Sequence, residues 1–115
     1  MLILKKNPSV VNETNTSWER KYFDSKDGVI NEIHSTIGTQ LFQVRHPTLK
    51  NVTIIYADKS NKINNFRLSY NGQWIKGVVY FVNSEGKSLT EEDCDKVIHS
   101  MKRYIITKEY IAGAK

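Results

Sequence analysis

The most regular alternation of apolar and polar residues lies between Asn64 and Val82, on either side of Asn71-Gly72. Asn-Gly favours a two-residue type I′ turn, because both residues tolerate the positive φ that this turn requires. We therefore predict a β-hairpin in which Tyr70 lies opposite Gln73 and Phe66 lies opposite Gly77. One face of the hairpin is then apolar and carries Phe66, Leu68, Tyr70, Ile75, Val79 and Phe81. The other face is basic and aromatic and carries Arg67, Ser69, Trp74, Lys76, Val78 and Tyr80.

Two segments before this hairpin also have strand patterns. Gln40–His46 alternates, with Phe42 and Val44 on one side and Leu41, Gln43 and Arg45 on the other. Val52–Ala57 is apolar at almost every position, which predicts a strand covered on both faces inside the sheet.

The N-terminal segment is less regular. Met1–Leu4 is compatible with a short edge strand, and residues 5–16 are expected to form an exposed connection. Residues 17–23 have both helical and alternating spacing, and we expect a strand there.

The segment Asp27–Gly38 fits two structures. Ile30, Ile33 and Ile37 have helical spacing, with Asp27 as an N-cap and Gly38 where a C-terminal cap belongs. Its β-branched residues also fit a longer strand. We expect a short helix over residues 28–37.

The C-terminal pattern predicts a long helix over residues 91–109. Thr90 can cap it, and acidic residues occupy the first turn, where the helix dipole favours negative charge. One apolar stripe follows at helical spacing, made of Cys94, Val97, Ile98, Met101 and Ile105. This stripe matches the apolar face of the hairpin. The expected fold is therefore α+β, a single domain over 1–115 with two layers, in which an antiparallel sheet of about four to five strands packs on the long C-terminal helix.

Charge adds a second feature to the predicted sheet. The chain has 17 basic and 12 acidic residues, a net charge of +5. Between Gln40 and Val82 the only acid is Asp58, against six basic residues, which are Arg45, Lys50, Lys59, Lys62, Arg67 and Lys76. The whole excess of positive charge therefore belongs to the sheet region.

Cysteine usage and the first residues indicate the compartment. The single cysteine, Cys94, excludes an internal disulfide, and the apolar run in MLILKK is too short for a signal-peptide core. We expect a cytoplasmic protein with no membrane partner.

Catalytic and metal-binding patterns are missing from the sequence. The glycines form no phosphate-binding loop, and His34, His46 and His99 have no paired cysteine or histidine spacing. Cys94 and His99 are five residues apart, about 500° around a helix, so they would not meet as nucleophile and base. We therefore predict no enzyme, no metal and no cofactor.

The remaining candidate site is the basic and aromatic sheet face. Single-stranded nucleic acids are bound by positive surfaces that follow the phosphates and by rings on which bases stack. The candidate residues are Arg45, Arg67, Trp74, Lys76 and Tyr80. The 13 lysines outnumber the 4 arginines, which favours phosphate attraction over base reading and predicts little sequence specificity.

Two functions fit this face, and the same residues could also be ordinary strand formers. The first is a non-enzymatic protein that binds nucleic acid, and the second is a protein-interaction module, such as an inhibitor, accessory or immunity-type factor. In the order of its elements alone, the second half of the chain resembles Whirly-type single-strand-binding domains, with no accompanying motif. An edge strand also allows a homodimer.

Overall fold

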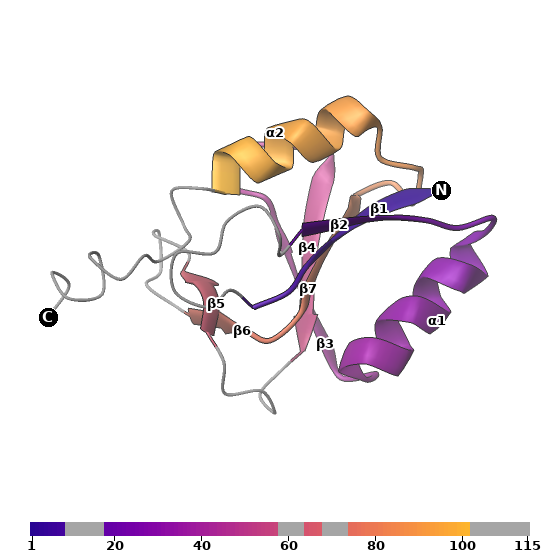
Figure 1. Ribbon diagram of the computed structural model, residues 1–115, viewed down its shortest axis with the longest axis horizontal. Coiled ribbons are helices and arrows are strands. Elements are labelled where there is room, and N and C mark those ends of the chain that lie inside the picture. Colours follow the sequence, from indigo (N-terminus) through magenta and orange to yellow (C-terminus); the bar gives the residue numbers. More distant parts are fainter. Residues whose placement is uncertain (9–17, 58–63, 68–73, 102–115) are drawn as a thin grey trace, which may run out of the picture.

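The computed structural model describes residues 1–8, 18–57, 64–67 and 74–101, which form seven strands and two helices (Figure 1). In chain order these are β1 (Leu2–Lys6), β2 (Trp18–Tyr22), α1 (Lys26–Ile37), β3 (Leu41–Arg45), β4 (Val52–Ala57), β5 (Asn64–Arg67), β6 (Trp74–Lys76), β7 (Val79–Asn83) and α2 (Glu91–Met101).

Five strands form one antiparallel sheet in the order β2-β1-β7-β4-β3, and β5 pairs only with β6. The predicted α+β class and antiparallel sheet are confirmed, as are the strands expected near residues 17–23, 40–46 and 52–57. β1 is not the predicted edge strand, because it lies between β2 and β7. Lys5 and Lys6 continue it, and Lys6 is buried, so the predicted exposed connection does not begin at residue 5.

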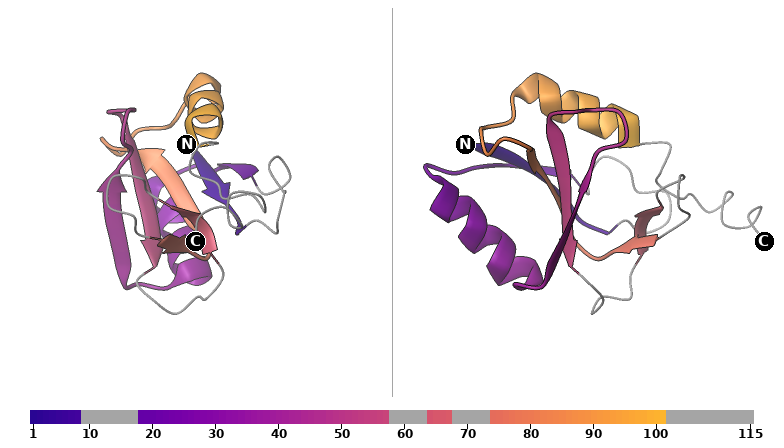
Figure 2. Two further views of the ribbon diagram at one scale, coloured as in Figure 1. Left: turned by 90° about the vertical axis from the view of Figure 1, so that its left-hand side faces the viewer. Right: turned by 180° about the vertical axis from the view of Figure 1, so that it is seen from behind.

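The two helices cover opposite faces of this sheet (Figures 1 and 2). Side chains alternate along a strand, so Val79 and Phe81 pack with α2 whereas Tyr80 packs with α1. β6 joins the α2 side, where Ile75 belongs to the same core cluster. The described part of the chain therefore has three layers, and the prediction of two layers is wrong.

The helix expected over residues 28–37 is confirmed as α1. Its N-cap is Ser25 and not Asp27, since the Ser25 hydroxyl accepts a hydrogen bond from the Gly28 N–H at 3.3 Å. Gly38 ends the helix with φ of 89°, a conformation that favours glycine. Val29 and Ile33 are buried against the sheet.

The C-terminal helix is confirmed over Glu91–Met101, 11 residues, and the rest of its predicted length lies outside the described residues. Its first turn is closed by a reciprocal pair: the Asp93 N–H donates to the Thr90 hydroxyl at 3.0 Å, and the Thr90 N–H donates to the Asp93 carboxylate at 2.9 Å. Cys94, Val97 and Met101 are buried in the core, as the apolar stripe predicted.

The predicted hairpin is changed in two ways. Gly77 has a φ of 73° and separates β6 from β7, so residues 74–82 do not form one continuous strand. β5 and β6 do pair antiparallel, but Phe66 lies opposite Ile75 and Arg67 opposite Trp74, two residues away from the predicted register. The Asn71-Gly72 turn, with residues 68–73, lies outside the described residues.

Candidate functional site

Three of the five predicted site residues lie on the β5–β6 hairpin, Arg67 on β5 and Trp74 and Lys76 on β6. Ile75 is 1% exposed in the α2-side core, whereas its neighbour Lys76 is exposed. Since successive residues of a strand alternate between faces, the positions of Trp74 and Lys76 belong to the face directed away from the core. Arg67 occupies the position directly opposite Trp74. Three of the five predicted positions, Arg67, Trp74 and Lys76, are therefore adjacent on one hairpin.

A hollow of about 200 Å³ lies beside Lys76. Its other lining residues come from the end of α1, from β4 and from the segment between β6 and β7: Thr36, Ile37, Gly38, Ala57, Gly77 and Val78. Cavities of about 150 Å³ accommodate a benzene ring. The hollow, which Lys76 helps to line, therefore has room for one flat ring.

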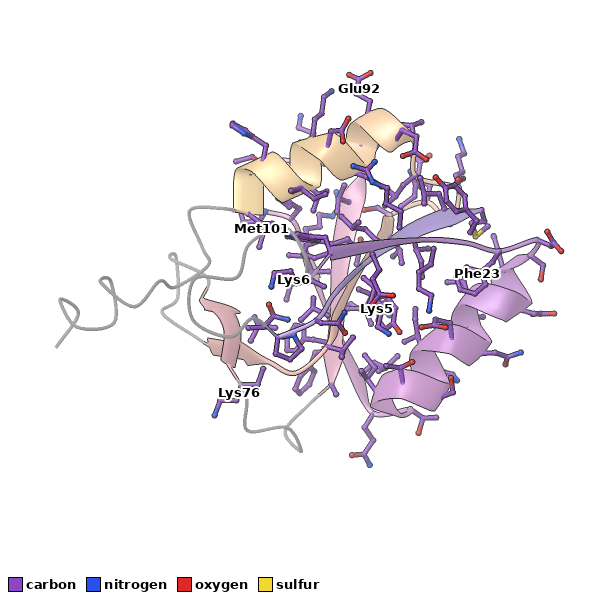
Figure 3. All side chains as sticks on the ribbon, viewed as in Figure 1. Lys5, Lys6, Phe23, Lys76, Glu92 and Met101 are labelled. Carbon is purple, nitrogen blue, oxygen red and sulfur yellow. The ribbon has the colours of Figure 1, made fainter. Side chains whose placement is uncertain are left out.

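The charge around this hairpin is positive. The described residues from β3 to β7 include no acid, and the described acids lie on β2, on α1, on α2 or in the connections next to the helices. In Figure 3, Lys76 points away from the sheet on the side opposite to Glu92. Lys76 forms no ion pair with another described residue. Among the described residues, none neutralises the charge of Lys76 for an anion that approaches this hairpin.

Tyr80 is not part of this face, and the prediction that placed it there is wrong. It is 0% exposed beneath α1, and its hydroxyl donates to the Glu32 carboxylate at 2.6 Å. Burial and this hydrogen bond raise the pKa of Tyr80, and the same bond lowers the pKa of Glu32. The physical reason is the break at Gly77, because β7 enters the central sheet with both of its faces covered.

Arg45 is exposed, but it is separated from the hairpin. It lies opposite Thr53, whereas the hollow beside Lys76 is lined by Ala57 of the same strand. Four residues of β-strand span about 13 Å. The structure therefore does not bring Arg45 together with Arg67, Trp74 and Lys76.

Two residues that help to place the hairpin, Lys6 and Asn65, are missing from the sites predicted from the sequence. Asn65 is buried, and its side-chain amide donates to the Gly77 carbonyl at 2.7 Å and to the Lys6 carbonyl at 3.2 Å. The Lys6 ammonium lies 5.5 Å from the centre of the Trp18 ring, and burial lowers the pKa of Lys6 to about 8. The alternation of Leu2, Leu4 and Lys6 is the signal that could have shown that Lys6 faces inward.

The other chemical candidates do not form a site in the described residues. Cys94 is buried, and burial raises the pKa of its thiol to about 11, which opposes thiolate formation. No group of three His, Cys, Asp or Glu side chains in the described ranges is arranged to hold a metal ion. Within the same ranges, no helix is both long and apolar enough to cross a membrane.

Comparison of the chain with protein-family models, curated proteins and solved structures finds no match. The resemblance in element order to Whirly-type domains gains no support from these comparisons.

Proposed function

We propose that this chain is a non-enzymatic protein that binds single-stranded nucleic acid, with little sequence specificity, through the outward face of the β5–β6 hairpin. Arg67 and Lys76 supply charge for phosphates, and Trp74 supplies a ring for base stacking. The site is smaller than the one predicted from the sequence, since it excludes Arg45 and Tyr80.

The observation that carries this proposal is the contrast between Ile75 and Lys76. Burial of Ile75 in the core fixes which way the hairpin faces, and the exposed Lys76 marks the surface that solvent reaches. The register then places Arg67 opposite Trp74 beside it, so charge and ring occupy neighbouring positions. Phosphate charge and base rings repeat at every nucleotide of a single strand, which is the pattern such a surface matches.

The test measures binding of a fluorescently labelled single-stranded oligonucleotide of mixed sequence by anisotropy, over a series of salt concentrations. We expect Lys76→Ala to weaken binding. It should also reduce the steepness of the fall of log K with log salt concentration by about 0.7, the contribution of one phosphate contact on a single strand. Trp74→Ala should lower affinity by about 1 to 3 kcal/mol if one base stacks on the ring.

Lys87→Ala is the matched control. Lys87 is exposed and is paired with Glu85 at 3.2 Å. The Lys87→Ala substitution removes the same charge as Lys76→Ala, but from a different part of the surface. We expect no effect beyond the small change in net charge. Absence of binding at low salt, or an equal loss in Lys87→Ala and Lys76→Ala, would contradict the proposal.

A protein-interaction module is the second candidate, and the outer edge of β3 favours it. β3 is the last strand of the sheet, and Phe42 is 44% exposed on it. Sheet edges of this kind accept an extended segment of another chain as an additional strand. Binding of a partner protein that survives nuclease treatment and is lost when the β3 edge is blocked would favour this function.

A further inference from the structure

The two edges of the sheet differ in how they are protected. The left panel of Figure 2 shows β3 at one margin and β2 at the other. β2 carries Glu19, Arg20 and Lys21 in succession, and Arg20 is paired with Glu91 at 2.7 Å and with Asp95 at 2.6 Å. Charged residues on an edge strand oppose pairing with another chain. The edge formed by β2 is therefore blocked.

The edge formed by β3 lacks this protection. Its sequence, LFQVR, contains one charged residue, Arg45, at its end. Phe42 and Val44 lie on the α2 side, where Phe42 contacts Tyr56 with ring centres 5.6 Å apart and Val44 packs against the core. No described segment pairs with the outer side of β3. The described sheet thus has one apolar edge with unpaired backbone groups.

The pattern of hydrogen bonds between β3 and β4 shows which residues of β3 present unpaired backbone groups at the edge. The His46 N–H donates to the Val52 carbonyl at 3.0 Å, in continuation of the β3–β4 register. In an antiparallel pair, residues alternate between hydrogen-bonded and non-hydrogen-bonded positions. Val44 and Phe42 therefore direct their backbone groups toward β4. Leu41, Gln43 and Arg45 direct theirs outward.

We infer that this edge pairs with the same edge of a second copy of the chain, around a two-fold axis at Gln43. In this register Gln43 lies opposite Gln43, and Leu41 lies opposite Arg45 of the second copy. All outward backbone groups of these residues then fall in hydrogen-bonded positions, which gives six hydrogen bonds across the interface.

The side chains of the strand suit the same register. Phe42 lies opposite Val44 of the second copy, twice by symmetry, in the non-hydrogen-bonded positions where Cα atoms approach to about 4.5 Å. Aromatic and β-branched residues in such cross-strand pairs are favourable. Arg45 faces Leu41, so no like charges lie opposite each other. The strand is complementary to itself, and this selects a second copy over an unrelated strand.

A cross-linking experiment tests the register. Gln43→Cys should form a disulfide-linked dimer under mild oxidation, because the two Cα atoms of this pair would be about 5.5 Å apart. Arg45→Cys, on the same side of the strand, is the matched control; its two copies would be about 13 Å apart and should not cross-link. Cys94 is buried and out of reach in both variants. Equal cross-linking of both variants, or of neither, would overturn the inference.

Sedimentation equilibrium tests the pairing itself. The mass of the wild-type chain should rise with concentration from 13.3 kDa toward twice that value. Gln43→Pro removes an outward N–H and none that pairs with β4, so it should weaken self-association about tenfold or more at unchanged circular dichroism. Gln43→Thr keeps the N–H and should still dimerise.

The inference does not depend on nucleic-acid binding. A chain that stays monomeric at high concentration while it binds oligonucleotides would refute the dimer and leave the proposed function intact. A chain that stays monomeric but loses a different protein partner in Gln43→Pro would also refute the dimer and favour the interaction module.

Discussion

Removal of the Tyr80 hydroxyl tests whether this residue belongs to the core or to a binding surface. Tyr80→Phe keeps the ring, which is packed with Ile3, Val29 and Ile33, and removes the hydroxyl that donates to Glu32 and also interacts with the Thr36 side chain. The Glu32 side chain is 16% exposed and keeps an ion pair with Lys21 at 3.1 Å. Hydrogen bonds to charged groups contribute about 1.5 to 3 kcal/mol. Because Lys5 and Lys21 still pair with the Glu32 carboxylate, the expected loss is near the lower end, about 1.5 to 2 kcal/mol.

Urea denaturation followed by circular dichroism measures this loss as a lower midpoint at unchanged slope. Tyr22→Phe is the matched control, since Tyr22 is exposed and its hydroxyl donates a hydrogen bond to Glu91 at the surface. The loss of stability in Tyr22→Phe should be clearly smaller than in Tyr80→Phe. Oligonucleotide affinity of Tyr80→Phe should equal that of the wild type. Unchanged stability together with weaker oligonucleotide binding would refute the assignment of Tyr80 to the core.

Two further predictions concern the buried His46 and the N-terminal cap of α2. His46 is buried, its Nδ1 accepts hydrogen bonds from the Thr48 and Leu49 N–H groups at 3.0 Å, and burial lowers its pKa. As the pH falls, the unfolded chain therefore protonates His46 at a higher pH than the folded chain does. The free energy of unfolding should then fall as the pH drops below about 6.5. Urea midpoints over this pH range should show this fall, and His46→Gln should make the fall smaller. Thr90→Ala removes the cap of α2 and should cost about 1 kcal/mol in the same assay, whereas Thr90→Ser should keep most of that stability; equal stability of both variants would contradict the role of the cap.

Elements that depend on neighbouring residues were predicted well from the sequence. α2 combines a capping pair, acidic residues in its first turn and an apolar stripe, all within a few residues of one another. α1 ends where Gly38 has the left-handed φ expected of a C-terminal cap. β4 is apolar on both faces because helices cover both sides of the sheet, and that composition was visible in the sequence.

Long-range pairing could not be predicted in the same way. Nothing local to Leu2–Lys6 shows that it lies between β2 and β7, since this depends on partners about 15 and 75 residues away along the chain. The error at Tyr80 has a local cause. The predicted alternation of apolar and polar residues continues through Gly77, but the positive φ of this glycine ends one strand and allows the next to join a different sheet.

The two proposals together predict a gain in affinity for long oligonucleotides. Pairing of two β3 strands around an axis normal to the sheet keeps each face on its own side, so both β5–β6 hairpins lie on the α2 side of the joined sheet. An oligonucleotide long enough to reach both hairpins binds the second hairpin at a high effective concentration, whereas a short oligonucleotide does not.

The comparison that isolates this effect uses one short and one long oligonucleotide of the same composition. The wild-type chain should bind the long strand more tightly per hairpin than the short one. Gln43→Pro should lose this advantage and keep the affinity for the short strand, because its hairpin is unchanged while the β3 pairing is weakened. Gln43→Thr should behave as the wild type. If the advantage persists in Gln43→Pro, the two hairpins are not joined through β3, since a linkage by any other surface would leave the long strand equally favoured.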